Sequence, residues 1–154
     1  MFSTQALLGA HMVRSGLLML FTLLSGGVIV ALLKQAAARA RPTELIEHGF
    51  NGFGLPFSGY PFNSFPSSHA LTAFALAAVA GHIHPYLRVP MWFFAVMVAT
   101  CRVLTLEHYP SDVMFSAVIA YGCANFWAHR VMNPRADWPL QRRWRPTDAE
   151  RKAW

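Results

Sequence analysis

Cationic, hydroxyl, imidazole and carboxylate side chains fall in three short groups, each at the end of an apolar segment. Cations and hydrogen-bond donors bind phosphate-like anions, and a histidine can attack as a nucleophile or carry a proton. The three groups therefore predict an anion site with the parts needed for group transfer. Their members are Lys34 and Arg41; Ser67, Ser68 and His69; and Arg102, His108 and Asp112.

The first group consists of Lys34 and Arg41, which are seven residues apart. On a helix that continues past Lys34, seven residues make nearly two turns, so both side chains would share one face. Pro42 is then expected to end that helix. Taken alone, the pair is explained slightly better by two side chains that snorkel to a membrane interface.

The second group, Pro66-Ser67-Ser68-His69, stands directly before an apolar, alanine-rich segment. Serine is a favoured N-cap residue, and the free N–H groups at a helix N-terminus bind anions. The alternative is an ordinary cap beside a solvated histidine, which is the more frequent case for such a group on its own.

The third group begins with Arg102 inside an apolar segment, where an ionisable side chain is costly and a functional candidate. Its guanidinium can bind phosphate oxygens in pairs, with snorkelling as the alternative. His108 precedes a helix start marked by Pro110. Asp112 would accept a hydrogen bond from one imidazole nitrogen and leave the other free to attack. Otherwise Asp112 serves the helix dipole, and His108 faces water.

The elements that must position these groups are strongly apolar. Of the 154 residues, 55% are hydrophobic and 13% are charged, against about 25% charged in soluble domains. This composition argues against a soluble enzyme and excludes disordered, collagen-like and coiled-coil chains. An all-α, polytopic membrane bundle of about four spans is predicted instead. The spans are expected at 16–33 (starting nearer residue 4), 70–83, 89–106 and 113–132.

An even number of spans places both termini on one side of the membrane. Nine basic residues share that side, namely Arg14, Arg88 and seven after residue 129, and four lie on the other. The positive-inside rule makes the termini cytoplasmic and puts all three polar groups on the extracytoplasmic face. Residues 1–132 are expected to form the membrane domain and 133–154 a basic cytoplasmic tail. No nucleic-acid module accompanies this tail, so no nucleic-acid partner is expected.

The segment 42–66 holds four Pro, four Gly and five Phe in 25 residues and is too broken for a span. A long loop in a compact domain often acts as a lid or binding element. The equal alternative is an interfacial loop whose Phe side chains anchor in lipid headgroups. Thr43 is expected to cap a short helix that runs through His48.

The remaining cysteines and histidines indicate neither a disulfide nor a metal site. Cys101 and Cys123 lie in apolar surroundings and are expected to be buried small hydrophobes. The other histidines near the span ends are interpreted as interface residues: His82, His84 and His129. No cofactor is predicted.

In order and internal spacing, the three groups resemble the signature of the type 2 phosphatidic acid phosphatases. Their superfamily also includes the vanadium haloperoxidases. The matching pattern is Lys34-x6-Arg41-Pro42, Pro66-Ser67-Ser68-His69 and Arg102-x5-His108-x3-Asp112. Three motifs in order are far more specific than any one of them, and with the flanking spans the resemblance covers most of the chain.

The resemblance implies a metal-independent lipid phosphatase of a bacterial inner membrane. His108 would attack phosphorus to form a phosphohistidine, oriented by Asp112, while His69 would protonate the leaving oxygen and then activate water. The substrate would be a lipid phosphate monoester or an isoprenyl diphosphate, and the bilayer is the other partner. The phosphoryl oxygens would be held by Lys34, Arg41, Ser67, Ser68 and Arg102.

The chain departs from the family pattern in three ways. Ser68 stands where the family usually has Gly, but it still offers its backbone N–H, so activity is expected to survive. Cys101 stands where the family has Ser and lacks a hydroxyl that could bind phosphate. Members usually have six spans, so the first two are expected to be absent, as in a minimal member or a fragment.

Three alternatives remain. A catalytically impaired fragment or anion-binding membrane protein could keep this shape, although such a protein would more often have lost one of the two histidines. A vanadate-dependent haloperoxidase would use the same anion pocket, but those enzymes are soluble. A membrane haem bundle would need paired histidines inside the spans, whereas His69 and His108 lie at span ends.

Overall fold

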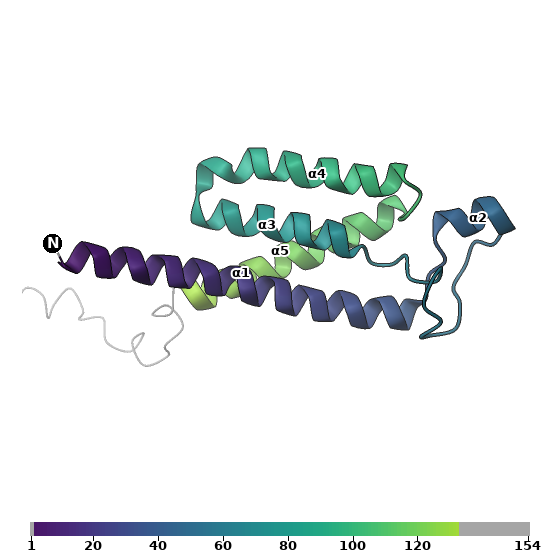
Figure 1. The fold of residues 1–154 in the computed structure, drawn as a ribbon, viewed down its shortest axis with the longest axis horizontal. Helices are drawn as coiled ribbons and strands as arrows, with labels where there is room; N and C mark the ends of the chain where they lie inside the picture. The colour runs from purple at the N-terminus through teal and green to yellow at the C-terminus, as the bar shows by residue number, and fades with distance from the viewer. Residues whose placement is uncertain (1, 133–154) are drawn as a thin grey trace, which may run out of the picture.

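The computed structural model describes residues 2–132, with side chains from residue 8 onward. All regular elements of this part of the chain are helical (Figure 1). The elements are α1 (Phe2–Ala37), α2 (Pro42–His48), α3 (Ser68–Ile83), the short 3-10 helix η1 (Pro85–Leu87), α4 (Arg88–Leu104) and α5 (Pro110–Met132).

The four long helices α1, α3, α4 and α5 occupy the four segments that the sequence predicts as spans. Two candidate spans are long and apolar enough to cross a membrane, Leu8–Ala37 and Pro85–Leu104. Helix α3 is apolar but has 16 residues, fewer than the roughly 20 of a typical span. The predicted all-helical bundle is therefore confirmed, and α1 begins at Phe2, close to the start expected near residue 4.

Helix α3 is the central element, since it packs against each of the other long helices. Its sequence is rich in alanine, and nine of its residues are buried. Small side chains let the neighbouring helices approach closely. At Gly26 of α1, an added Cβ would lie 3.2 Å from a Leu71 methyl group of α3. The core of the bundle is thus built from short side chains around α3.

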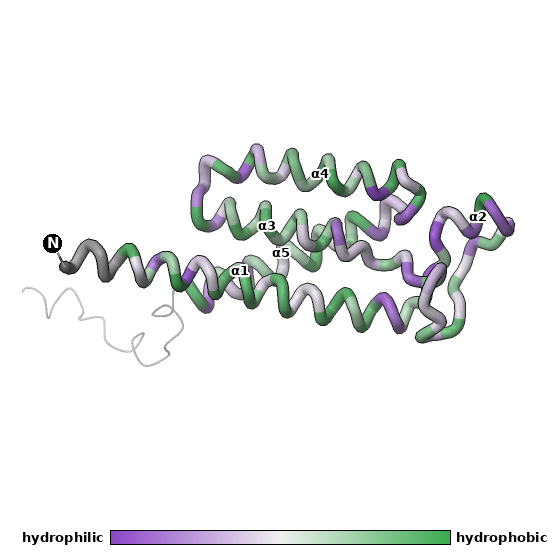
Figure 2. The backbone as a smooth tube through the Cα atoms, in the orientation of Figure 1, coloured by the Kyte–Doolittle hydropathy of each residue, from purple (hydrophilic) through white to green (hydrophobic). Residues whose placement is uncertain are grey.

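The outer faces of the helices carry apolar side chains, as a bilayer requires. On α1, four hydrophobic residues at intervals of four form an exposed stripe: Leu20, Leu24, Val28 and Leu32. Residues spaced in this way share one helix face. Figure 2 shows hydrophobic residues along the long helices and hydrophilic ones mainly near the helix ends, including the region around α2. An exposed apolar surface of this extent suits contact with lipid.

Several local expectations are wrong. The first helix ends at Ala37, before Pro42, and Ala38 takes a left-handed conformation with φ 43°. Pro42 begins α2 instead of ending a helix. Thr43 does not cap α2, because Arg41 occupies the N-cap position and no side-chain cap forms. A proline is favoured in the first helical turn, which explains the earlier start.

The two cysteines are free, and their surroundings are less enclosed than expected. Cys101 is exposed and Cys123 is half-buried. The difference for Cys101 arises because an apolar stretch in a membrane helix can face outward as well as inward. The predicted basic tail, 133–154, lies outside the described residues.

Candidate active site

The three polar groups meet at one end of the bundle. Four helix ends lie there, because α1 and α4 end and α3 and α5 begin at this end (Figure 1). The segment 38–66, which contains α2, covers the same end. The order and direction of the predicted spans already imply that the three groups meet. Specific side-chain and backbone contacts bring their members together.

His108 is held by a backbone carbonyl. Its side chain is 4% exposed, and Nδ1 lies 2.6 Å from the oxygen of Ser64. A carbonyl only accepts hydrogen bonds, so Nδ1 carries the proton and Nε2 keeps its lone pair. Burial lowers the pKa of His108 to about 4; nearby Lys34 and Arg41 add to this, while the bond to Ser64 and Asp112 oppose it. His108 is therefore a neutral imidazole with a free nitrogen.

Asp112 is fully buried and accepts three hydrogen bonds. Arg39 Nη1 approaches Oδ1 at 2.5 Å. Ser64 Oγ and the Tyr109 N–H donate to Oδ2 at 2.6 and 2.9 Å. His108 Nδ1 lies 3.9 Å from Oδ2, so the direct hydrogen bond expected from the sequence does not form. Ser64 stands between the two, and it binds Asp112 through its hydroxyl and His108 through its carbonyl.

Arg39 and Ser64 are two residues that sequence reasoning missed. Arg39 also donates to Ser111 Oγ at 2.8 Å and stacks over the Tyr109 ring at 4.2 Å. The Ser64 N–H donates to the Arg39 carbonyl at 3.0 Å, so the two residues are joined through the backbone and also share Asp112 as a side-chain partner. A basic residue between Lys34 and Arg41 was the available signal for Arg39. A lone serine in a loop offers none.

Lys34 and Arg41 both bind Asn63. Lys34 lies in the last turn of α1, and Arg41 follows the end of that helix. Lys34 Nζ donates to the Asn63 carbonyl at 2.9 Å, and Arg41 Nε donates to its side-chain oxygen at 2.9 Å. Arg41 also forms an ion pair with Glu107. The predicted pairing of the two cations is therefore achieved by the loop, although the helix expected to carry both is interrupted.

The cations of this cluster lie close enough to repel one another. Burial lowers the pKa of Arg41, and the nearby charge of Arg102 lowers it further, against an opposing effect of Tyr60. Holding like charges close together costs free energy, and a bound anion offsets that cost. Arg102 is half-buried in the last turn of α4, and its carbonyl accepts the His108 N–H at 3.3 Å.

The start of α3 supplies the remaining predicted groups. Ser67 is the N-cap, as expected, and its buried hydroxyl accepts from the Ala70 N–H at 3.4 Å. The Ser67 N–H lies 3.5 Å from the Asp112 carbonyl, which ties α3 to α5. Ser68 and His69 form the exposed first turn of α3. Among the residues described, no hydrogen bond or ion pair joins His69 to His108.

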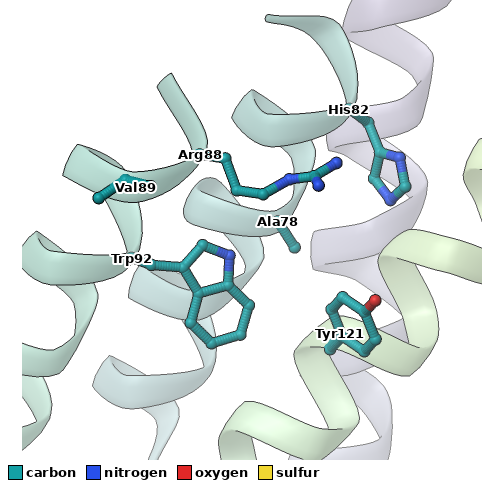
Figure 3. Close-up of a pocket in the computed structure, with 6 residues that line it drawn as sticks. All are labelled: Ala78, His82, Arg88, Val89, Trp92 and Tyr121. Carbon is teal, nitrogen blue, oxygen red and sulfur yellow. The ribbon is translucent and has the colours of Figure 1, made fainter. Parts of the chain in front are cut away.

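A separate pocket lies at the other end of the bundle, between α3, α4 and α5 (Figure 3). Its volume is about 550 Å³. His82, interpreted from the sequence as an interface residue, lines this pocket and lies 2.9 Å from Asn125 Oδ1. The pocket contains none of the residues in the three polar groups. The other lining residues are Ala78, Arg88, Val89, Trp92 and Tyr121.

Comparison with known proteins agrees with the motif pattern. The model of the PAP2 superfamily matches residues 15–136. The chain is 39% identical over 108 residues to a lipid A 1-phosphatase of Rhizobium johnstonii, which covers 70% of this chain and 43% of the relative. It is 38% identical over 102 residues to a lipid A 1-phosphatase of Rhizobium etli, covering 66% and 43%. The chain thus spans less than half the length of these relatives. No solved structure matches it significantly.

Proposed function

Because the chain belongs to the PAP2 superfamily, we propose that it is a membrane lipid phosphatase that acts through a phosphohistidine. One observation carries the proposal. His108 is buried and neutral, its Nδ1 is fixed on the Ser64 carbonyl, and the charges of Lys34 and Arg41 lie close enough to lower its pKa. A neutral imidazole with one fixed nitrogen is a suitable nucleophile, and clustered cations stabilise the charge of a transferring phosphoryl group.

The first step is attack of His108 Nε2 on phosphorus. The N–P bond forms as the P–O bond to the lipid breaks, and the electron pair of that bond goes to the leaving oxygen. In the transition state, negative charge is spread over the three equatorial phosphoryl oxygens. His69, in the exposed first turn of α3, gives its proton to the leaving oxygen. Donors and cations from all three groups hold the phosphoryl oxygens: Lys34, Arg41, Ser67, the N–H of Ser68 and Arg102.

The second step returns the enzyme to its starting state. His69, now neutral, takes a proton from water, and the water oxygen attacks phosphorus. The N–P bond breaks and inorganic phosphate leaves. Asp112 acts through Ser64 to hold the imidazole in place during both steps. No step calls for a metal ion, because the cations supply the charge that Mg²⁺ provides in other phosphoryl-transfer enzymes.

The substrate we propose is a lipid phosphate, with lipid A first among candidates because both relatives carry the name lipid A 1-phosphatase. Phosphatidate, phosphatidylglycerol phosphate and an isoprenyl diphosphate are further candidates, because each carries a phosphoryl group that the same cations and donors could bind. We place the enzyme in a bacterial inner membrane, with its site on the extracytoplasmic face and both termini in the cytoplasm. The nine-to-four distribution of basic residues supports this orientation.

The test is phosphate release by the full chain purified in detergent. Radiolabelled lipid A, phosphatidate, phosphatidylglycerol phosphate and isoprenyl diphosphate are offered in turn. Activity on one or more of them is expected to persist in EDTA, to be inhibited by vanadate and to vanish in the His108→Asn variant. Acid-labile, base-stable label on the trapped protein would identify phosphohistidine. Loss of activity in EDTA that Mg²⁺ restores would contradict the mechanism.

A further inference from the structure

The pocket at the end of the bundle away from the phosphate site combines a cationic side with an aromatic one. Arg88 and His82 lie along one side, and the rings of Trp92 and Tyr121 lie along the other (Figure 3). The two rings meet edge to face, with their centroids 6.1 Å apart. The volume of about 550 Å³ is within the size range of ligand pockets. A ligand that matches this lining carries an anionic group beside an apolar one.

Contacts with neighbouring helices position the two polar side chains of this pocket. The stem of Arg88 lies against Gly81 of α3, where an added Cβ would meet the Cβ, Cγ and Nε atoms of Arg88 at 3.4 Å each. Because residue 81 has no side chain, the arginine stem crosses α3 and brings its guanidinium to the pocket. His82 is positioned by Asn125 of α5, whose side-chain oxygen lies 2.9 Å from Nε2.

The charge of Arg88 has no counterion in the part of the chain that the structure describes. Within that part, its side chain forms no hydrogen bond or ion pair. The carboxylates of the described residues all lie in α2 or around the start of α5, at the phosphate-site end: Glu44, Glu47, Glu107 and Asp112. A lone arginine at a helix end can simply face water. The place of Arg88 on a pocket wall instead favours an anion that comes from outside this part of the chain.

The apolar wall of the pocket continues toward the middle of the membrane. Trp92 also lines a second cavity, of about 460 Å³, whose lining between α4 and α5 includes no charged residue. Trp92 and Val96 follow Arg88 by one and two turns of α4, so at about 1.5 Å of rise per residue they lie about 6 and 12 Å deeper. One leaflet provides about 15 Å of hydrocarbon. An acyl chain that begins at Arg88 would therefore pass both residues within its own leaflet.

We propose that this pocket binds an anionic phospholipid of the leaflet opposite the phosphate site, as a bound lipid that is not the substrate. The guanidinium of Arg88 would hold the lipid phosphate through paired hydrogen bonds, and an acyl chain would follow Trp92 into the second cavity. A free phosphate offers the same anion, but only a lipid also covers the apolar wall. In the orientation proposed above, this leaflet is the cytoplasmic one, whose anionic lipids attract basic residues.

The test compares the binding of phosphatidylglycerol and phosphatidylcholine to the full chain in detergent by native mass spectrometry. The phosphate of phosphatidylglycerol is a diester, so a phosphate monoesterase does not consume it. Wild-type protein is expected to prefer phosphatidylglycerol by about tenfold or more, the value of hydrogen bonds to a charged group, and Arg88→Gln should abolish this preference. Arg14→Gln is the matched control, since Arg14 is an exposed arginine that does not line the pocket, and it should keep the preference. A wild-type protein without preference, or an unchanged preference in Arg88→Gln, would overturn the inference.

Cross-linking locates the lipid and separates this inference from the proposed activity. Phosphatidylglycerol with a photoreactive group near the start of one acyl chain is cross-linked to the full chain, and the labelled peptides are identified. Label on the α4 peptide that contains Trp92, reduced in Arg88→Gln, supports the pocket whether or not any substrate is hydrolysed. Label confined to the peptides of Lys34 and Ser68 would leave the phosphatase proposal standing and refute this pocket. Equal displacement of the α4 label by glycerol 3-phosphate, which has no acyl chains, would show a site for free anions and refute the lipid.

Discussion

Asp112 illustrates at the scale of single residues how the site is held together. It is fully buried, and three donors from separate parts of the chain bind its two oxygens. Removing one partner of a buried ion pair typically costs about 3–5 kcal/mol, because the other charge is left uncompensated. Since Ser64 binds both Asp112 and His108, a shift of the carboxylate is passed to the imidazole. We therefore propose that Arg39 is a positioning residue.

Replacing Arg39 with Met is expected to lower kcat by about 10- to 100-fold, because the imidazole loses its alignment. KM should change little, since Arg39 binds Asp112 and does not belong to the phosphate set. Arg39→Lys should recover part of kcat by restoring the positive charge. Steady-state kinetics of the two variants beside Arg14→Met, which alters an exposed arginine of α1, provide the measurement. A rise in KM at unchanged kcat would instead show that Arg39 binds the phosphate.

The lowered pKa of His108 predicts how its charge, and with it the stability of the fold, depends on pH. The imidazole should stay neutral down to pH of about 4, well below the ordinary value of 6.5. Between these values the unfolded chain binds this proton and the folded chain does not. The contribution of His108 to the free energy of unfolding should therefore be complete above pH 6.5 and should be lost as the pH falls toward 4. The ¹⁵N chemical shifts of His108 in detergent, assigned with His108→Asn, give the titration directly, and a midpoint at or above 6.5 would refute the prediction.

The role of His69 depends on the leaving group. A phosphate monoester expels an alkoxide, which needs a proton, whereas a diphosphate expels a phosphate whose second pKa is about 6. General acid catalysis is worth about 10²- to 10⁴-fold. His69→Ala should lose about that much activity on phosphatidate and clearly less on an isoprenyl diphosphate, while His108→Asn abolishes both. Equal losses on the two substrates would mean that His69 only binds or orients the phosphate.

At the scale of elements, the segment 38–66 does more than connect two helices. Its backbone pairs with itself, since the Ala40 N–H donates to the Gly52 carbonyl at 3.0 Å and the Gly54 N–H to the Ala38 carbonyl at 2.7 Å. Further along the same segment, the Asn63 carbonyl accepts from Lys34 of α1, and the Ser64 hydroxyl binds Asp112 in the first turn of α5. The loop is therefore part of the site, and its packing should affect catalysis.

Gly54 is the position where this packing is tightest. An added Cβ would lie 2.8 Å from two ring atoms of Phe62 and 3.3 Å from its Cβ. Phe62 precedes Asn63, and because its Cβ is also close, at 3.3 Å, rotation of the ring alone does not relieve the whole contact. Gly54→Ala should therefore lower kcat several-fold and destabilise the fold by about 1–3 kcal/mol.

The matched control is Gly52→Ala, whose added Cβ would meet only the far end of the Phe50 ring, at 3.2 Å. Thermal unfolding and phosphate release are measured together for both variants. Equal behaviour of the two would show that the loop adapts without moving Asn63 and Ser64.

At the scale of the whole molecule, every group of the site lies at one end of the bundle, so its function depends on which side of the membrane that end faces. We expect a reporter fused after Trp154 to be cytoplasmic and one inserted beside Gly59 to be extracytoplasmic. The excess of basic residues on the side of the termini is the physical reason. Alkaline phosphatase and fluorescent-protein fusions report the two sides in opposite ways. A C-terminal reporter on the outside would reverse the assignment.

Apolar runs and motif spacing in the sequence were enough to predict the helices and the end of the bundle where the polar groups meet. Apolar runs predicted the four long helices, and the parity of those helices placed Lys34, Ser67 and Arg102 at one end. Helix-start signals were also local: Ser67 caps α3 and Pro110 begins α5, as expected. These features depend on neighbouring residues or on the alternation of helix direction, so the sequence alone suffices to predict them.

The tertiary structure decided how the groups contact one another. The partner of His108 is the backbone of Ser64, which lies 44 residues away along the chain, and the partner of Asp112 is Arg39, at a separation of 73. A carbonyl has no signature in the sequence, because every residue carries one. The break of α1 at Ala37 and the left-handed Ala38 set the direction of the loop that brings Arg39 to Asp112. Burial, which lowers the pKa of His108, arises only when all these segments pack together.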